Sequence, residues 1–392
     1  MNILITGGGM ENKGAQSMTF IMVEELRKRY PEDNILLMIP DDCGLVESGI
    51  YNFSTYTARI KSLFYINGGA SKALAKIKKV DKIDAQKLED IFSESRMLVD
   101  ISGYALSSVW STYVVRFYLM MIKCANKFNV PVYIMPQSFG PFDYKFPKVL
   151  YMNKIIKKTM AYPEVIYARE QEGYDFLTKK YNLKNVKLSY DMVLINQKID
   201  LNNIYLKLPN KCDFNIKNNS VAIIPNARNF DYGNEAEIMQ LYKSIIIFLL
   251  ESEKNVYVLY HSSEDSKICK KLKELFADDA RVNLIEKDLN CFEYEQIADN
   301  FDFVIASRYH SIIHSYRNRV PCVAIGWATK YYDLLSAFNQ NEYVFDVREK
   351  VETDKILSKI KKMMQNREEE SIKIESELKE IRKENIFDIL NK

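Results

Sequence analysis

The chain has few cysteines and almost no excess charge, and both shortages narrow what it can be. Its 392 residues hold six cysteines, widely spaced and without a Cys-x-x-Cys pair. We therefore expect reduced, mostly structural thiols rather than a disulfide framework. The net charge is only +3 and no long basic block stands out, which gives little support to a nucleic-acid partner.

Long apolar runs are missing as well. No run approaches the ~20 residues that a membrane-spanning helix needs. The opening MNILITGGG is typical of a first β-strand with a glycine turn and lacks the order of a signal peptide. We therefore expect a cytoplasmic enzyme. The chain also lacks a GxSxG elbow and a Walker loop, so hydrolase and NTPase functions have little support.

What the chain does have is an alternation of strand and helix patterns, repeated in two halves. This alternation predicts an α/β fold with two doubly wound, Rossmann-like domains. Residues 206–219 lose periodicity and gain Asn, Lys and Pro, which indicates a linker. We predict an N-terminal domain over 1–205, a C-terminal domain over 220–352, and a helical segment over 353–392 that packs back on the first domain.

Cationic or ionisable side chains follow several predicted strands of the second half. Arg228 comes after VAIIPNA, His261 ends VYVLY, Arg308 and His310 follow FVIAS, and Lys330 lies beyond VAIGWAT. Because ligands bind at the carboxyl ends of strands and anions bind at helix N-termini, we expect an anion site on this rim. The imidazole of His310 is the group suited to move a proton there.

A metal site at the same place has less support. His310 and His314 are spaced i, i+4 and would share one helix face. No HExxH motif accompanies them and no third ligand is evident. We predict no metal, and a buried, hydrogen-bonded His314.

Three turns of the first half are expected at one sheet edge: Gly7–Ala15 with Asn12, Asp100–Tyr104 with Gly103, and Pro136–Pro141 with Gln137 and Ser138. Their side chains could bind sugar hydroxyls, although turn chemistry alone also explains them. The glycine turn is a poor dinucleotide fingerprint, because its third glycine is misplaced. For Arg169, a salt bridge with Glu170 or Glu172 is the favoured role. For Asp191, a structural role, as a cap or in a hydrogen bond across the cleft, is favoured over catalysis.

From the first strand to about residue 345, the sequence resembles the polysaccharide pyruvyl transferase family. The matching motifs, in order, are GGGxxNKGA, DISG at 100–103, PQSFGPF at 136–142, YARE at 167–170, SYD at 189–191 and SRYHSIIHSYRNRVPCVAIGWATK at 307–330. The chain departs from the family pattern in two places. Tyr104 stands where a second glycine is usual, which would narrow the acceptor side, and Trp327 replaces a smaller residue near Lys330.

The resemblance implies a GT-B-like arrangement with the active site in the cleft between domains. It implies phosphoenolpyruvate as donor, no further cofactor, and a sugar of a surface glycan or its lipid-linked precursor as acceptor. Peripheral contact with a membrane through such an acceptor stays open.

For the site residues, Arg308 and His310 match the family's Arg-x-His, and Arg228 is a candidate second arginine. Donor binding is then expected at Arg308, Arg228, Lys330 and His261, with His310 as catalytic acid. Acceptor binding is expected at Asn12, Gly103, Gln137 and Ser138. The alternatives are a GT-B nucleotide-sugar glycosyltransferase and an inactive glycan-assembly protein of the same fold.

Overall fold

The structure is a computed structural model that describes residues 1–41, 49–68, 82–210, 213–349 and 351–391. Cys43, Cys212 and residues 211–212 of the expected linker lie outside the described residues. The other four cysteines are free, buried thiols. Among the described helices, none is long and apolar enough to cross a bilayer.

The first domain is built on a parallel, seven-stranded sheet with strand order β3-β2-β1-β4-β5-β6-β7. The strands are β1 (Asn2–Thr6), β2 (Asn34–Pro40), β3 (Ser54–Ala58), β4 (Ser95–Asp100), β5 (Val132–Gln137), β6 (Val165–Ala168) and β7 (Val186–Leu188). The helices around it are α1 (Lys13–Arg29), α2 (Ile60–Ile66), α4 (Lys82–Ser93), α5 (Thr112–Lys127), α6 (Lys148–Met160) and α7 (Gln171–Asp175), which runs into a π-helical turn, η1 (Phe176–Lys180). Two short helices, α8 (Met192–Ile195) and α9 (Leu201–Ile204), lead toward the second domain.

The second domain repeats this plan with a six-stranded sheet of order β10-β9-β8-β11-β12-β13. Its strands are β8 (Ser220–Ile224), β9 (Asn255–Leu259), β10 (Val282–Ile285), β11 (Phe303–Ala306), β12 (Cys322–Gly326) and β13 (Val344–Asp346). Its helices are α10 (Ala227–Tyr232), α11 (Glu235–Glu251), α12 (Ser266–Glu274), α13 (Cys291–Ala298), α14 (Tyr309–Arg317) and α15 (Thr329–Ser336). The predicted fold class, α/β with two doubly wound domains, is confirmed.

The strand order places one switch point in each domain. In the first sheet the chain adds β2 and β3 on one side of β1 and then crosses to the other side of β1 to form β4. In the second sheet it makes the same change of side between β8 and β11. Loops diverge at such a point and leave a crevice at the carboxyl ends of the strands, where ligands bind. The turns after β1, β4, β8 and β11 are therefore the expected walls of a site.

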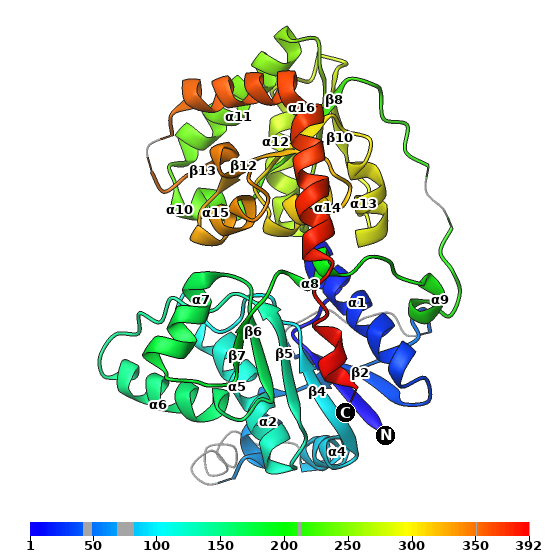
Figure 1. Cartoon of the computed structure of the whole chain (residues 1–392), viewed down its shortest axis with the longest axis vertical. Coiled ribbons are helices and arrows are strands. Elements are labelled where there is room, and N and C mark those ends of the chain that lie inside the picture. Colours follow the sequence, from blue (N-terminus) through cyan, green and yellow to red (C-terminus); the bar gives the residue numbers. More distant parts are fainter. Residues whose placement is uncertain (42–48, 69–81, 211–212, 350, 392) are drawn as a thin grey trace.

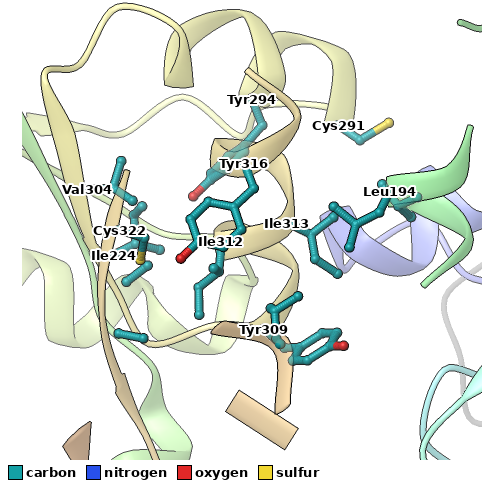
Figure 2. Packing of buried hydrophobic residues seen from close by; sticks show 14 of the residues in the cluster. Leu194, Ile224, Cys291, Tyr294, Val304, Tyr309, Ile312, Ile313, Tyr316 and Cys322 are labelled. Carbon is teal, nitrogen blue, oxygen red and sulfur yellow. The ribbon is translucent and has the colours of Figure 1, made fainter. Parts of the chain in front are cut away.

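The central strands of the second domain are apolar and buried. VAII of β8 and FVIA of β11 are completely or almost completely buried, as expected for central strands with helices on both faces. Figure 2 shows Ile312 and Tyr316 of α14 on the side facing Val304 and Cys322, with Ile313 toward Leu194 of α8. Helix α14 is thus fixed on one side by its own sheet and on the other by the interdomain segment.

The C-terminal segment runs along both domains. Helix α16 (Thr353–Ile381) packs against α11, α14, α8 and the strands β11 and β12, and Figure 1 shows it descending from the second domain. The residues after α16 contact the first domain, where Ser189 Oγ donates to Glu384 Oε2 at 2.6 Å, Tyr30 Oη donates to Leu390 O at 2.6 Å and Arg29 Nε donates to Asn391 Oδ1 at 2.7 Å. Most of the segment expected on the first domain therefore lies on the second.

Candidate active site

A cleft of about 310 Å³ lies between the two domains, where the two switch points face each other. Its first-domain walls come from the turns after β1, β4 and β6, and its second-domain walls from the turns after β8, β9, β11 and β12. The lining residues that the sequence predicted are Asn12, Gly103, Arg228, His261, Arg308, His310 and Lys330.

Two glycines of the first turn allow the close approach of other groups. Gly7 has φ +78°, and a Cβ there would lie 2.0 Å from Ser102 Oγ. Both the backbone conformation and the lack of space therefore exclude a side chain. Gly14 lies in the first turn of α1, and a Cβ there would lie 2.3 Å from the ring of His310. The first domain therefore offers His310 a surface that only glycine provides. Asn12 caps α1, its side chain accepting from Gly14 N at 2.9 Å and Ala15 N at 3.3 Å.

The turn after β4 is held from below by Asp100. This buried carboxylate accepts from Ser102 N at 3.1 Å, Ser102 Oγ at 3.0 Å and Gln137 Nε2 at 2.8 Å. Gln137 is fully buried and does not line the cleft. The structure thus contradicts its predicted contact with the acceptor, because the side chain points into the sheet edge toward Asp100. Gly103, at φ +65°, forms the cleft wall above it.

Arg308 is held at the cleft by hydrogen bonds to two carboxylates. Its Nε donates to Asp265 Oδ2 at 2.8 Å and its Nη2 to Asp265 Oδ1 at 2.6 Å, while Glu264 accepts from the same Nη2. Burial alone would lower the pKa of Arg308, but the hydrogen bonds and charge of Asp265 raise it. The guanidinium is permanently charged and fixed in direction. Its Nη1 makes no hydrogen bond within the described part of the chain and can face a ligand.

His310 lies in the first turn of α14 and faces the other domain. Its Nε2 lies 3.5 Å from Asp191 Oδ2, an ion-pair distance at the limit of a hydrogen bond. Burial lowers the pKa of His310, Asp191 opposes this, and the charges of Arg169 and Lys330 add to it. Burial would raise the pKa of Asp191, but His310 and Arg169 hold it well below its usual range. A neutral imidazole therefore faces an ionised carboxylate.

Arg169 connects these groups to the first domain. Its Nη1 donates to Asp191 Oδ2 at 2.6 Å, its Nε donates to Ser138 Oγ at 3.0 Å, and its guanidinium lies 4.2 Å from the ring centre of Tyr309. The sequence predicted a salt bridge between Arg169 and Glu170 or Glu172. The ion pair with Glu170 is present, with Glu170 Oε2 3.8 Å from Arg169 Nε, and a shorter ion pair joins Arg169 to Asp191. Arg169 also lines the cleft, which makes it a site residue in addition.

Lys330 lies in a cage of aromatic rings. Its Nζ is 4.8 Å from the ring centre of Tyr104, 5.4 Å from Tyr309, 5.3 Å from Trp327 and 5.7 Å from Tyr331. Burial among these rings lowers the pKa of Lys330 to about 7, with Arg169 and Arg308 acting in the same direction and Glu170 opposing. A group with this pKa can gain or lose a proton when a charged ligand enters.

His261 and Arg228, the other two residues predicted to bind the donor, differ in how deeply they are buried. His261 is 1% exposed, and neither ring nitrogen has a hydrogen-bond partner in the described part of the chain. Burial lowers its pKa well below the ordinary value, so the ring is neutral. Arg228 is at the rim, 41% exposed in its side chain, 3.2 Å from Asp231 and 5.7 Å from the ring centre of Trp110.

His314 lies one helical turn beyond His310 on α14. The ring is buried, with Nε2 at 3.3 Å from Ser17 Oγ and Nδ1 at 3.9 Å from Glu295. Across the described residues no group of three or more His, Cys, Asp or Glu side chains is arranged to hold a metal ion.

A second hollow of about 170 Å³ adjoins the cleft, sharing Tyr104, Trp327 and Lys330 with it. Its floor is the loop Ser138–Pro141, in which Glu170 accepts from Ser138 Oγ at 3.0 Å and Phe139 N at 3.2 Å. Burial raises the pKa of Glu170 to about 7, partly offset by Arg169. On the other wall, Tyr232 and Trp327 stack with ring centres 4.4 Å apart. Ser138 lines this hollow, although its hydroxyl is shared between Arg169 and Glu170.

Comparison with known proteins assigns the chain. The family model described as polysaccharide pyruvyl transferase matches residues 12–329. This stretch includes every residue named in the cleft except Lys330 and Tyr331, which follow it directly.

Solved structures share the two-domain fold at low identity. The UDP-GlcNAc 2-epimerase from Neisseria meningitidis, bound to UDP-GlcNAc, superposes with a TM-score of 0.55 at 10% identity, covering 95% of this chain and 94% of that one. A putative UDP-N-acetylglucosamine 2-epimerase from Listeria monocytogenes gives 0.56 at 8% identity, with 95% and 90% covered. UGT71G1 from Medicago truncatula, complexed with UDP-glucose, gives 0.51 at 11% identity, with 97% and 98% covered. The domain arrangement is therefore GT-B-like.

Proposed function

Because the chain belongs to the polysaccharide pyruvyl transferase family, we propose that it transfers the pyruvyl group of phosphoenolpyruvate to a sugar of a surface glycan or its precursor. The product is a ketal that bridges two sugar hydroxyls, and phosphate is released. The observation that carries this proposal is the meeting of Arg308, Arg169, Lys330 and His310 in one interdomain cleft.

Phosphoenolpyruvate carries a phosphate and a carboxylate, and the cleft has fixed cations for both. Arg308 is charged and oriented by Asp265, and Arg169 is oriented by Asp191. Lys330 becomes fully charged once an anion lies beside it, since a nearby negative charge raises the pKa of an ammonium group. Arg228, at the rim, is placed to meet the donor as it enters. His261 offers a neutral ring for a hydrogen bond deeper in the cleft.

The proposed reaction balances without an oxidant, a reductant or a separate cofactor. One sugar hydroxyl adds to the central carbon of the donor, and a proton is added to its methylene carbon, which becomes a methyl group. The bond to phosphate then breaks, and the second hydroxyl closes the ketal. The two hydroxyl protons end on the methyl group and on the released phosphate.

His310 is proposed as the group that moves these protons. Its imidazole is neutral before the donor binds and gains a proton as the donor anion neutralises the surrounding positive charge. It then delivers this proton to the methylene carbon and recovers one from an attacking hydroxyl. Asp191, at 3.5 Å, stabilises the imidazolium form and holds the ring in place.

The hollow next to the cleft is proposed as the acceptor side. It is open to a sugar, and its walls carry the Tyr232–Trp327 stack and the carboxyls of Glu170 and Glu172. Aromatic faces cover the apolar face of a sugar, and carboxylates accept from its hydroxyls. Of the acceptor residues expected from sequence, Ser138 lines this hollow, whereas Asn12 and Gly103 line the neighbouring cleft. We also place the reaction in the cytoplasm, where phosphoenolpyruvate is made.

The test is the product itself. Surface glycan from cells that contain this protein should carry a pyruvate ketal by mass spectrometry, and the ketal should disappear when the gene is deleted or carries His310→Ala. Glycan that is identical in all three strains contradicts the proposal and favours the inactive assembly protein. Loss of a whole sugar, instead of a ketal, favours the nucleotide-sugar glycosyltransferase.

A further inference from the structure

Large apolar side chains are exposed on one outer edge of the first domain. They belong to the loop before α6 and to its first turns: Phe146 is 79% exposed, Leu150 65% and Tyr151 55%. Figure 1 shows α6 at the periphery of the domain. Side chains of this size at the surface mark a contact with another apolar phase when they are grouped.

The same segment is basic and contains no acid. Between Tyr144 and Pro163 the sequence has no Asp or Glu and has five exposed lysines: Lys145, Lys148, Lys154, Lys157 and Lys158. None of these lysines forms a salt bridge with a described residue, although Lys148 Nζ donates to Thr112 Oγ1 at 2.9 Å. The whole chain has nearly balanced charges, with 52 acidic and 55 basic residues, so this segment is much more basic than the rest.

Helical spacing separates the two faces of α6. Met152, Ile156 and Met160 are buried, and the helix packs there against α5. The outward positions are Leu150, Tyr151, Lys154, Lys157 and Lys158. They follow the i, i+4, i+7 spacing of one helical stripe. The stripe is apolar at its start and basic toward its end.

We propose that this surface, defined by Phe146, Leu150, Tyr151 and the five lysines and called here the α6 patch, docks on an anionic lipid bilayer. Apolar side chains can enter the boundary between headgroups and acyl chains, while the lysines extend to the negative headgroups. The charge chooses the partner: juxtamembrane lysines are attracted to anionic lipid, whereas an apolar patch without them would fit a protein surface equally well.

The position of the α6 patch also favours a lipid-linked acceptor. Residues 139–141 line the acceptor hollow, and Phe146 follows five residues later. A chain of this length spans at most about 18 Å. A bilayer that touches the patch therefore lies close to the hollow, within reach of a sugar carried on a membrane lipid. This extension rests on the proposed function, but the docking itself does not.

Vesicle co-sedimentation tests the docking without any enzyme assay. The full chain should sediment with vesicles of phosphatidylcholine and phosphatidylglycerol at low salt, less at high salt, and hardly with phosphatidylcholine alone. Phe146→Ser/Leu150→Ser and Lys154→Glu/Lys157→Glu should each weaken partitioning by at least about tenfold. Matched controls are Ile372→Ser, at a side chain 67% exposed on α16, and Lys267→Glu/Lys270→Glu on α12; both should sediment like the original chain.

Three outcomes would overturn the docking: no sedimentation of the original chain with anionic vesicles, equal loss in the controls, or undiminished binding by both patch variants. Self-association that only the patch variants lose, without vesicle binding, would make the surface a contact between copies. Unchanged far-ultraviolet circular dichroism and melting temperature show that a variant has folded. A chain that binds vesicles but does not bind phosphoenolpyruvate would keep the docking and refute the proposed function.

Discussion

His310 Nε2 lies 3.5 Å from Asp191 Oδ2, so the second domain's ionisable ring meets a carboxylate on the segment that leaves the first. The same carboxylate oxygen accepts from Arg169 Nη1 at 2.6 Å. The buried carboxylate of Asp191 thus orients both His310, the proposed proton donor, and Arg169, a proposed binding residue for phosphoenolpyruvate. The arrangement exists only while the two domains are together.

Asp191→Asn should lower turnover strongly and leave the fold intact. The amide keeps the size of the side chain but cannot stabilise an imidazolium, so we expect kcat to fall by about 10²–10⁴. The alkaline limb of the pH profile, where His310 loses the proton it must deliver, should move to lower pH, because the group that raises the pKa of His310 is gone. Phosphate release from phosphoenolpyruvate and an acceptor measures both effects. Asp200→Asn, at an exposed helix cap, is the control, and a loss there as large as at Asp191 would show a structural effect.

Gly14→Ala tests the contact between α1 and His310. The added Cβ would lie 2.3 Å from the imidazole, so the ring must leave its present position beside Asp191. We expect at least about a tenfold loss of kcat, since small misplacements of catalytic groups are costly. The matched change Gly9→Ala meets only Ala15 Cβ at 3.9 Å and should leave activity unchanged. Equal activity of the two variants would show that His310 takes no part in the chemistry or does not lie against Gly14.

Donor binding should take up protons around neutral pH. Burial lowers the pKa of Lys330 to about 7, and an anion beside it raises that pKa. Above pH 7 the free group is neutral and the bound group charged, so affinity falls as pH rises, by up to about tenfold per unit. Titration in buffers of different ionisation enthalpy measures the uptake. Lys330→Arg stays charged and should lose the Lys330 share of the uptake; an uptake at pH 8 equal to that of the original chain would contradict this origin.

Asp265→Asn should weaken donor binding through Arg308. Asp265 is fully buried and accepts both Nε and Nη2 of that arginine. Without the paired carboxylate the guanidinium loses its fixed direction, and we expect KM for phosphoenolpyruvate to rise about tenfold or more while kcat changes less. Asp231→Asn removes the partner of the rim residue Arg228 and should change KM by less than about threefold. A fall in kcat alone for Asp265→Asn would argue against a binding role for Arg308.

Strand-end reasoning predicted much of the second-domain wall. Arg308, His310 and Lys330 all line the cleft, because the carboxyl ends of parallel strands share one edge. The same rule fails to give side-chain direction. It placed Gln137 at the correct edge, yet the amide turns inward to Asp100. Nothing in a one-dimensional pattern shows which of two neighbouring residues faces a crevice.

Contacts between the domains were harder to predict. Asp191 and Arg169 follow strands of the first sheet, and the sequence favoured a local salt bridge for Arg169 and a structural role for Asp191. Their partner His310 belongs to the other domain, and only the closed cleft brings it within 3.5 Å. Trp327, recognised as an unusual residue near Lys330, does form part of its aromatic cage, at 5.3 Å. The sequence did not indicate the edge strands β3 and β13, which are short or weakly patterned.

The most direct test of the donor assignment is isothermal titration of the full chain with phosphoenolpyruvate and, separately, with UDP-GlcNAc. Arg308→Gln tests the site, and Arg281→Gln, at an exposed arginine paired with Asp279, is the control. We predict binding of phosphoenolpyruvate by the original chain and the control, at least about tenfold weaker binding by Arg308→Gln, and no heat from UDP-GlcNAc. Binding of UDP-GlcNAc without binding of phosphoenolpyruvate would contradict the account.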